Sequence, residues 1–170
     1  MAESNLLVTF DPVHEQSAKT EIENLIKETK VKAKILKSEE GLAEISASNA
    51  KELIKKVLEL VKKKTKKLCY TFNWWPVDKW CKAEIKDMQK AISEIEKGIK
   101  SSDKWKLELS KRKTDKEYGR DIIIKLTEVV EKPKVDLNNP DKIIKVEIIG
   151  EKAAISLIGK GESISASDFK

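Results

Sequence analysis

Three consecutive cations, Lys111, Arg112 and Lys113, follow a segment in which apolar and polar residues alternate. The alternation over residues 105–110 predicts a strand, so the triplet stands at a strand end, where a loop can bring it to a bent phosphate backbone. The alternative is a solvated surface, because exposed basic triplets are common. Arg112 and Arg120 are the only arginines beside 33 lysines. A guanidinium group is planar and can donate two parallel hydrogen bonds to a phosphate or to the edge of a base. We expect Arg112 and Arg120 to make such contacts.

A second basic run consists of Lys62–Lys64, Lys66 and Lys67, broken only by Thr65. It follows an amphipathic segment, so one interpretation is a solvated helix end, where cations complement the helix dipole. The other interpretation is contact with phosphates. The sequence leaves both open.

Enzymatic motifs are absent from the sequence. No Gly-x-Gly-x-x-Gly turn and no phosphate-binding P-loop occurs, and His14 is the only histidine. His14 with Cys69 and Cys81 cannot supply a four-ligand zinc site in the usual finger spacings. We expect both cysteines to be small buried residues, and burial raises a thiol pKa instead of activating the thiol. The sequence therefore predicts no catalytic residue, no metal and no cofactor.

The composition favours a polyanionic partner. The 170 residues carry a net charge of +6 with a pI near 9.1, and 39% are hydrophobic while 38% are charged. A basic surface gains affinity for nucleic acid because each neutralised phosphate releases counterions. The sequence shows neither a leader nor an apolar run of about 18 residues. We therefore expect a globular cytoplasmic protein with no membrane contact.

The first 74 residues predict six elements in the order strand, helix, strand, strand, helix, strand, which is the ferredoxin-like βαββαβ motif. A turn at Asp11-Pro12 precedes the first helix, and Asn49 is the expected cap of the second helix. The predicted strands are residues 5–10, 32–37, 42–47 and 68–74. The predicted core stripes of the two helices are Ala18, Ile22, Leu25, Ile26 and Thr29, and Leu53, Ile54, Val57, Leu58 and Val61.

Residues 75–170 predict a second α/β unit. After Trp75-Pro76 a helix is expected, with Ile85, Met88, Ile92, Ile95 and Ile99 on its apolar face. The strand 105–110 follows, then a helix that starts at Thr114 or Asp115 and ends before Pro133. A short strand at 135–137 and a hairpin of 143–149 with 153–158, joined by Gly150-Glu151, complete this unit, and the SISAS segment is an edge or tail.

Two adjacent tryptophans lie at the predicted junction of the two units. Neighbouring residues of a strand face opposite ways, so Trp74 and Trp75 cannot both fill the core of the first domain. We expect one of them to pack where the two domains meet. Stacking on a nucleobase is the other interpretation of this pair.

Four segments together resemble a known family. They are NLLVTFDPVHEQSAKTEI, YTFNWWPVDKW, WKLELSKR and VDLNNPDKIIKVEIIGEKAAISLI. In this order they are similar to the stand-alone THUMP-domain proteins related to the fungal adaptor of tRNA cytidine acetylation. The resemblance implies an α+β chain with a ferredoxin-like domain at residues 1–74 and a THUMP RNA-binding domain at residues 75–170.

The resemblance also implies a ligand and a partner. In THUMP enzymes this pair of domains grips the acceptor end of tRNA, and a further domain performs thiolation, methylation, deamination or pseudouridylation. For the adaptor subgroup, the implied role is to present tRNA to an acetyltransferase that forms N4-acetylcytidine. By position, Lys111, Arg112, Lys142 and Lys145 fall at strand ends where the family meets RNA; Lys113 and Arg120 complete the expected RNA-binding set.

Three functional hypotheses follow. The first is a tRNA-binding protein without catalytic activity that presents tRNA to a separate modifying enzyme. The second is the RNA-binding subunit of a split enzyme for thiolation, methylation or pseudouridylation, with the catalytic domain on another chain. The third is a protein-interaction module whose lysines serve only solubility.

Overall fold

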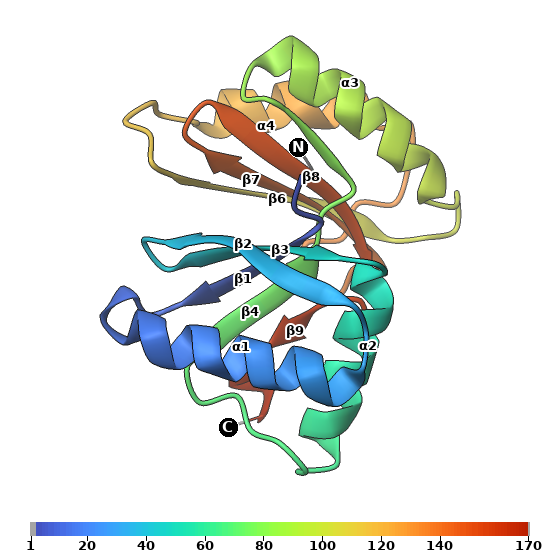
Figure 1. Cartoon of the computed structure of the whole chain (residues 1–170). Coiled ribbons are helices and arrows are strands. Elements are labelled where there is room, and N and C mark those ends of the chain that lie inside the picture. Colours follow the sequence, from blue (N-terminus) through green and yellow to red (C-terminus); the bar gives the residue numbers. More distant parts are fainter. Residues whose placement is uncertain (1–2, 170) are drawn as a thin grey trace. The chain divides into compact units, whose positions relative to one another are not determined.

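Two β-sheets, each flanked by helices, make up the α+β fold in the computed structural model, which describes residues 3–169 (Figure 1). The chain divides into two compact units, Met1–Pro76 with Gly161–Lys170, and Val77–Lys160. The domain boundary expected after Trp74 and the observed division after Pro76 differ by two residues. The larger difference is at the end of the chain, where residues from 161 onward lie with the first unit.

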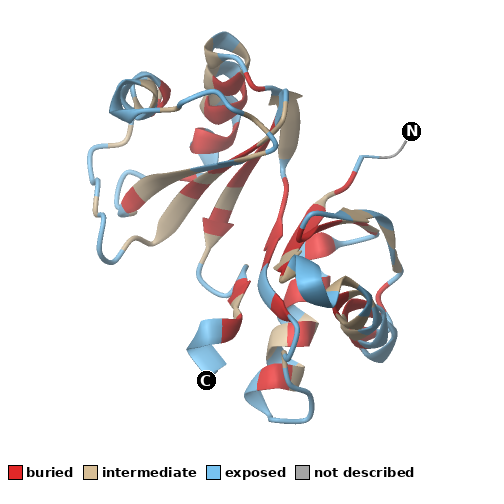
Figure 2. Cartoon of the chain, turned by 90° about the vertical axis from the view of Figure 1, so that its left-hand side faces the viewer, coloured by how far each residue is buried: buried red, intermediate tan, exposed pale blue. Residues whose placement is uncertain are grey.

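The first unit contains a five-stranded antiparallel sheet in the order β2-β3-β1-β4-β9. Its core combines the inward residues of the sheet with the apolar stripes of two helices, and each helix carries both buried and exposed residues (Figure 2). The strands are β1 (Leu6–Phe10), β2 (Ala33–Glu39), β3 (Leu42–Ala47), β4 (Thr71–Pro76) and β9 (Ile164–Ser165); the helices are α1 (Glu15–Thr29) and α2 (Ala50–Lys62).

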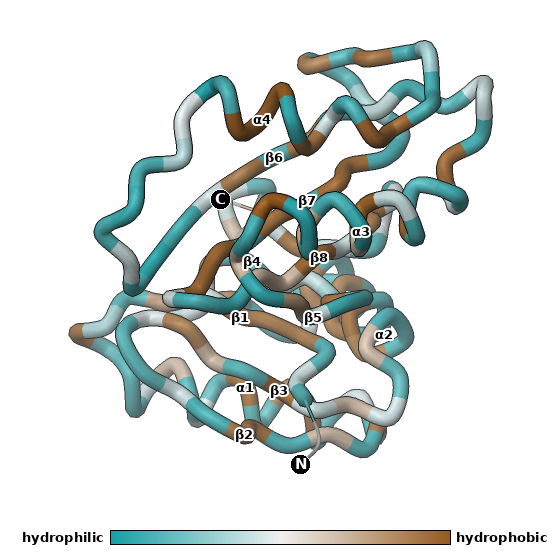
Figure 3. Tube along the Cα trace, turned by 90° about the horizontal axis from the view of Figure 1, so that it is seen from above, coloured by the Kyte–Doolittle hydropathy of each residue, from teal (hydrophilic) through white to brown (hydrophobic). Residues whose placement is uncertain are grey.

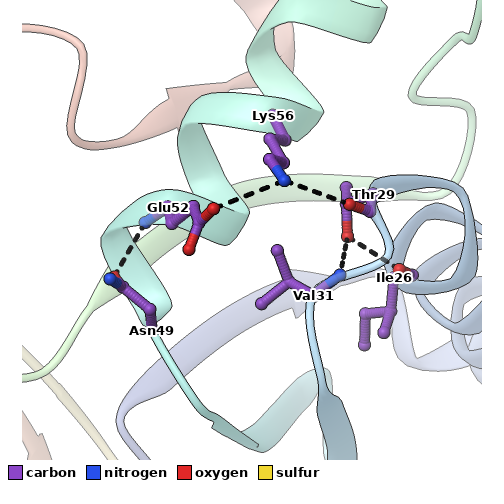
Figure 4. Close-up of polar contacts among 6 residues, drawn as sticks. All are labelled: Ile26, Thr29, Val31, Asn49, Glu52 and Lys56. Carbon is purple, nitrogen blue, oxygen red and sulfur yellow. Dashed lines mark hydrogen bonds and ion pairs between the residues drawn. The ribbon is translucent and has the colours of Figure 1, made fainter.

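Local chemistry determines where these two helices begin and end. The Asn49 side chain accepts a hydrogen bond from the Glu52 N–H at 3.0 Å, the N-cap expected from the sequence (Figure 4). At the end of α1 the Thr29 hydroxyl donates to the Ile26 carbonyl at 2.7 Å. Lys56 joins the two helix ends, because its ammonium lies 3.3 Å from the Glu52 carboxylate and 3.5 Å from the Thr29 carbonyl.

The buried residues of α1 are the five that its spacing predicted, Ala18, Ile22, Leu25, Ile26 and Thr29. In α2 four of the five expected residues are buried and Leu58 is only partly buried. Trp74 lies in the core of this unit, whereas Trp75 pairs with Leu7 and faces the other side of the sheet. The opposite orientation of the two tryptophans is therefore confirmed.

The second unit contains a four-stranded mixed sheet in the order β5-β8-β7-β6, in which β6 runs parallel to β7. Both helices contribute to one core with alternate residues of the strands, and the centre of that core includes Ile144, Val146 and Ile148. The strands are β5 (Lys79–Lys82), β6 (Trp105–Arg112), β7 (Lys142–Ile149) and β8 (Lys152–Gly159); the helices are α3 (Ile85–Ile95) and α4 (Arg120–Thr127).

Several elements differ from the sequence prediction. Strand β5 was not expected; it exists because β8 supplies its partners, with Lys79 opposite Ile155. Strand β4 begins at Thr71, so residues 68–70 form a loop, and α4 begins at Arg120 instead of Thr114 or Asp115. At 135–137 only an isolated bridge to Trp105 forms.

The SISAS segment, expected as an edge or tail of the second unit, forms the edge strand β9 of the first sheet. Ile164 pairs with Trp74, and only 2% of Ile164 is exposed, so this short strand fills the core of the first unit. Burying an isoleucine removes its apolar surface from water, which favours this return of the chain.

Candidate nucleic-acid interface

The basic triplet lies where β6 ends and a loop leads to α4. Lys113 adopts the left-handed conformation (φ 57°), which turns the chain away from the sheet, and the Arg112 carbonyl accepts a hydrogen bond from the Gly150 N–H at 2.9 Å. Residues 111–120 contain five basic and two acidic side chains, a local charge of +3. The loop is hydrophilic over most of its length (Figure 3). This cationic loop, residues 111–120, is the candidate interface.

Arg112 is held by a buried carboxylate. Its Nη2 lies 3.8 Å from Oε1 of Glu147, whose side chain is only 4% exposed, while the Arg112 side chain is 26% exposed. The Ser110 hydroxyl donates a short hydrogen bond to the other Glu147 oxygen. Within the described chain the buried Nε of Arg112 has no hydrogen-bond partner. The guanidinium is thus positioned at the strand end, with donor capacity that Glu147 does not use.

Lys111 orders the loop. Its ammonium donates to the Lys116 carbonyl at 2.7 Å and lies 3.6 Å from the Glu117 carboxylate. Tyr118, further along the loop, packs against the core of the second unit. These contacts hold the loop in one conformation and leave Lys113, Lys116 and Arg120 exposed. An ordered group of exposed cations loses less conformational entropy on binding a phosphate backbone than a flexible one.

Lys142 and Lys145 lie in β7, away from the cationic loop. Lys142 begins β7 beside Trp105 in the parallel register, whereas Arg112 ends β6. Measured along the strands, Lys142 and Arg112 are seven residues apart, which is about 23 Å at about 3.3 Å per residue. Lys145 lies in the middle of β7, 3.8 Å from Glu108, which also pairs with Lys106 at 3.0 Å. Of the six predicted residues, Lys111, Arg112 and Lys113 are therefore consecutive at the end of β6. Arg120 lies at the other end of the same loop, where α4 begins, and Lys142 and Lys145 lie elsewhere on the sheet.

Two residues of this site, Glu147 and Ser110, were not predicted from the sequence. Glu147 anchors Arg112, and Ser110 anchors Glu147. The sequence did contain an indication of this ion pair, because Glu147 is an acidic residue inside the apolar run KIIKVEII. A carboxylate that is buried in a strand requires a positively charged or hydrogen-bonding partner.

The expected chemistry of the cysteines is corrected in part. Cys69 is exposed. It lies in the loop before β4, where the Glu21 carboxylate accepts hydrogen bonds from the backbone N–H groups of Cys69 at 2.6 Å and of Thr71, the first residue of β4, at 2.8 Å. Cys81 is half-buried, and burial, followed by the nearby Asp87 carboxylate, raises the pKa of its thiol from 9.0 to about 11. His14 is exposed and its ring centroid lies 5.7 Å from that of Tyr70.

No group of three or more His, Cys, Asp or Glu side chains in residues 3–169 is arranged to hold a metal ion. No helix in that range is both long and apolar enough to cross a membrane.

Comparison with solved structures shows the same fold in proteins of low sequence identity. The protein PH1313 from Pyrococcus horikoshii superposes with a TM-score of 0.68 at 18% identity over 92% of this chain. TrmN from Thermus thermophilus gives 0.56 at 14% over 89%, and a 4-thiouridine synthetase solved with RNA and ATP gives 0.54 at 16% over 96%. The matched regions cover 55%, 44% and 42% of those chains, respectively, so this chain spans about half of their length.

Sequence comparison defines the family of the second unit. No curated protein matches this chain. The family model of the THUMP domain matches residues 82–158, which run from the last residue of β5 almost to the end of β8 and include the cationic loop. Residues 82–158 of this chain are therefore a THUMP domain.

Proposed function

We propose that this chain binds tRNA through its THUMP domain and presents it, without catalysing the reaction, to a separate tRNA-modifying enzyme. The observation that carries the proposal is the cationic loop, an ordered segment with a charge of +3 inside the THUMP domain. Phosphate contacts of this kind supply affinity and orientation but no chemistry.

The structural relatives support RNA binding in tRNA modification. One of them is a 4-thiouridine synthetase solved as an RNA complex, and it shares this fold over 96% of the present chain. Within this proposal the first unit is a ferredoxin-like domain, as its strand order β2-β3-β1-β4 and antiparallel pairing suggest. The partner we propose is the tRNA acetyltransferase that forms N4-acetylcytidine, on the basis of the sequence resemblance described above.

A second candidate function is favoured by one specific observation. The solved structures that share this fold include a 4-thiouridine synthetase and a possible methylase from Clostridium difficile, and the matched part is only 42% of each chain. A split enzyme would carry the remaining part on another polypeptide. In that case this chain is the RNA-binding subunit of a thiolating, methylating or pseudouridylating enzyme.

RNA binding is tested by titrating the full chain with intact tRNA at several salt concentrations. If four to six phosphates are contacted, the slope of log K against log[salt] is about −3 to −5. The triple variant Lys113→Gln/Lys116→Gln/Arg120→Gln should make the slope less steep by about 2 to 3. Lys86→Gln/Lys90→Gln/Lys97→Gln removes the same charge from exposed positions of the same unit and should retain the wild-type slope. Absence of binding at low salt refutes the proposal.

The two candidate functions are separated by the partner and by the product. Nucleoside analysis of tRNA from cells lacking this chain should show loss of N4-acetylcytidine if the adaptor proposal is correct. Loss of a thiolated, methylated or pseudouridylated nucleoside, with a catalytic chain that co-purifies in equal amounts, would support the split enzyme instead.

A further inference from the structure

A second group of cations lies in the first unit, where α2 ends. A groove of about 380 Å³ is lined there by apolar and basic side chains, among them Val61, Lys64, Lys66, Lys67, Leu68 and Phe169. The volume lies in the range of small-ligand sites in proteins. None of these residues belongs to the THUMP domain.

Among the residues that the structure describes, the lysines of this groove have no acidic partners. Across residues 3–169, Lys62–Lys64, Lys66 and Lys67 form no ion pair. Their backbone is nevertheless ordered, since the N–H groups of Thr65 and Lys66 both donate to the Leu60 carbonyl, at 3.0 and 3.2 Å. Lys64 takes the left-handed conformation (φ 58°) that ends the helix. The cations therefore project from a defined turn.

Complementing the dipole of α2 does not account for this arrangement. The dipole effect decays within the last helical turn, whereas Lys66 and Lys67 lie beyond it. The helix dipole also gives no reason for an aromatic side chain to line the groove, and Phe169 does so with 39% of its surface exposed. Phe169 ends the short helix Ala166–Phe169 directly after β9, and the pairing of Ile164 with Trp74 ties that segment to the sheet.

We propose that this groove binds an unpaired stretch of the RNA, with Phe169 stacking on one base and Lys64, Lys66 and Lys67 contacting the phosphates beside it. The inference rests on the proposed RNA-binding function and adds a second, single-strand site to it. Sites for single-stranded nucleic acid combine a cationic groove with aromatic side chains, because every base has a face available for stacking. In a duplex the bases are already stacked on each other and only the phosphates would be accessible.

The test measures fluorescence anisotropy of a labelled six-nucleotide oligoadenylate on titration with the full chain. Phe169→Ala should weaken binding about 5- to 150-fold, the effect of losing one base-stacking contact. Phe169→Trp keeps a stacking surface and should restore the affinity. Lys64→Gln/Lys66→Gln/Lys67→Gln should make the salt slope less steep by about 2, at about 0.7 per phosphate of a single strand.

The matched control is Lys19→Gln/Lys27→Gln/Lys34→Gln, which removes the same charge from the α1 and β2 side of the first unit. It should leave the affinity for the oligonucleotide within about twofold of wild type, because distant exposed charges are screened. Equal oligonucleotide binding by wild type, Phe169→Ala and the Lys64 triple variant overturns the inference. So does equally tight, equally Phe169-dependent binding of a blunt duplex of the same length or of hexaglutamate, which would indicate a different class of ligand.

These outcomes separate the two proposals. If the oligonucleotide does not bind but tRNA binds in a manner that depends on Lys113, Lys116 and Arg120, only the single-strand site is refuted. If intact tRNA does not bind at low salt, the proposed function itself is refuted.

Discussion

Replacing Arg112 by alanine should destabilise the second unit as well as weaken RNA binding. Two unit charges at the observed 3.8 Å interact by about 1 kcal/mol in water and about 4 kcal/mol at an effective dielectric constant of about 20. The Arg112 side chain is 26% exposed, so water screens the pair in part, whereas Glu147 is almost fully buried. Removing the partner of a buried carboxylate leaves that charge uncompensated, and we expect a loss of about 2 kcal/mol.

Differential scanning calorimetry of the full chain measures this effect. For a unit of this size, about 2 kcal/mol lowers the unfolding temperature by about 8 to 16 °C. Glu147→Gln in the Arg112→Ala background removes the uncompensated charge and should recover more than half of the loss. If Arg112→Ala lowers the free energy of unfolding by less than about 0.5 kcal/mol, the typical range for surface substitutions, the pair does not stabilise the fold and the reasoning fails.

The double variant also isolates the role of Arg112 in binding. With the fold restored, any remaining loss of tRNA affinity relative to Glu147→Gln alone is due to the missing guanidinium. Wild-type affinity in Arg112→Ala/Glu147→Gln would show that Arg112 serves only to hold the strand end.

Three further predictions concern single residues. At pH 8 Cys69 should react with a thiol reagent well before Cys81, because the raised pKa of about 11 lowers the thiolate fraction of Cys81 roughly 100-fold relative to a thiol of pKa 9.0; equal rates would contradict the burial of Cys81. Ile164→Ala should cost about 2 to 5 kcal/mol in chemical denaturation of the first unit, and a cost below about 1 kcal/mol would mean that β9 does not fill its core. Gly41→Ala should destabilise the same unit, since Gly41 has φ +82° and an added Cβ would lie 2.7 Å from the Phe10 carbonyl oxygen; an unchanged unfolding temperature would contradict this.

Much of the fold could be predicted because the relevant interactions are local. The spacing of Ala18, Ile22 and Leu25 places them on one face of a helix whatever the rest of the chain does. Asn49 accepts from an N–H three residues ahead, and Gly150 takes the left-handed conformation (φ 64°) in the turn between β7 and β8. Each of these features depends only on residues that are a few positions apart, so a short stretch of sequence is enough to predict it.

The candidate site was predictable only in part. The position of Lys111–Lys113 at a strand end followed from the alternation of residues 105–110, and the structure has the strand ending at Arg112. Lys142 also lies at a strand end, but at the opposite end of the sheet from this triplet, because β6 and β7 are parallel and their register puts Lys142 beside Trp105. Strand direction is a property of the sheet, and no short segment specifies it.

The sequence by itself determined most of the helices and strands of this protein, the cap of α2, the turn between β7 and β8, and the positive charge that favours a polyanionic ligand. Only the tertiary structure decided which of these elements pair: Ile164 with Trp74 about ninety residues earlier, Arg112 with Glu147, and Lys79 with Ile155. The physical reason is that helical period and capping depend on neighbours along the chain. The choice of strand partners and buried ion pairs depends on the free energy of burying the whole core at once.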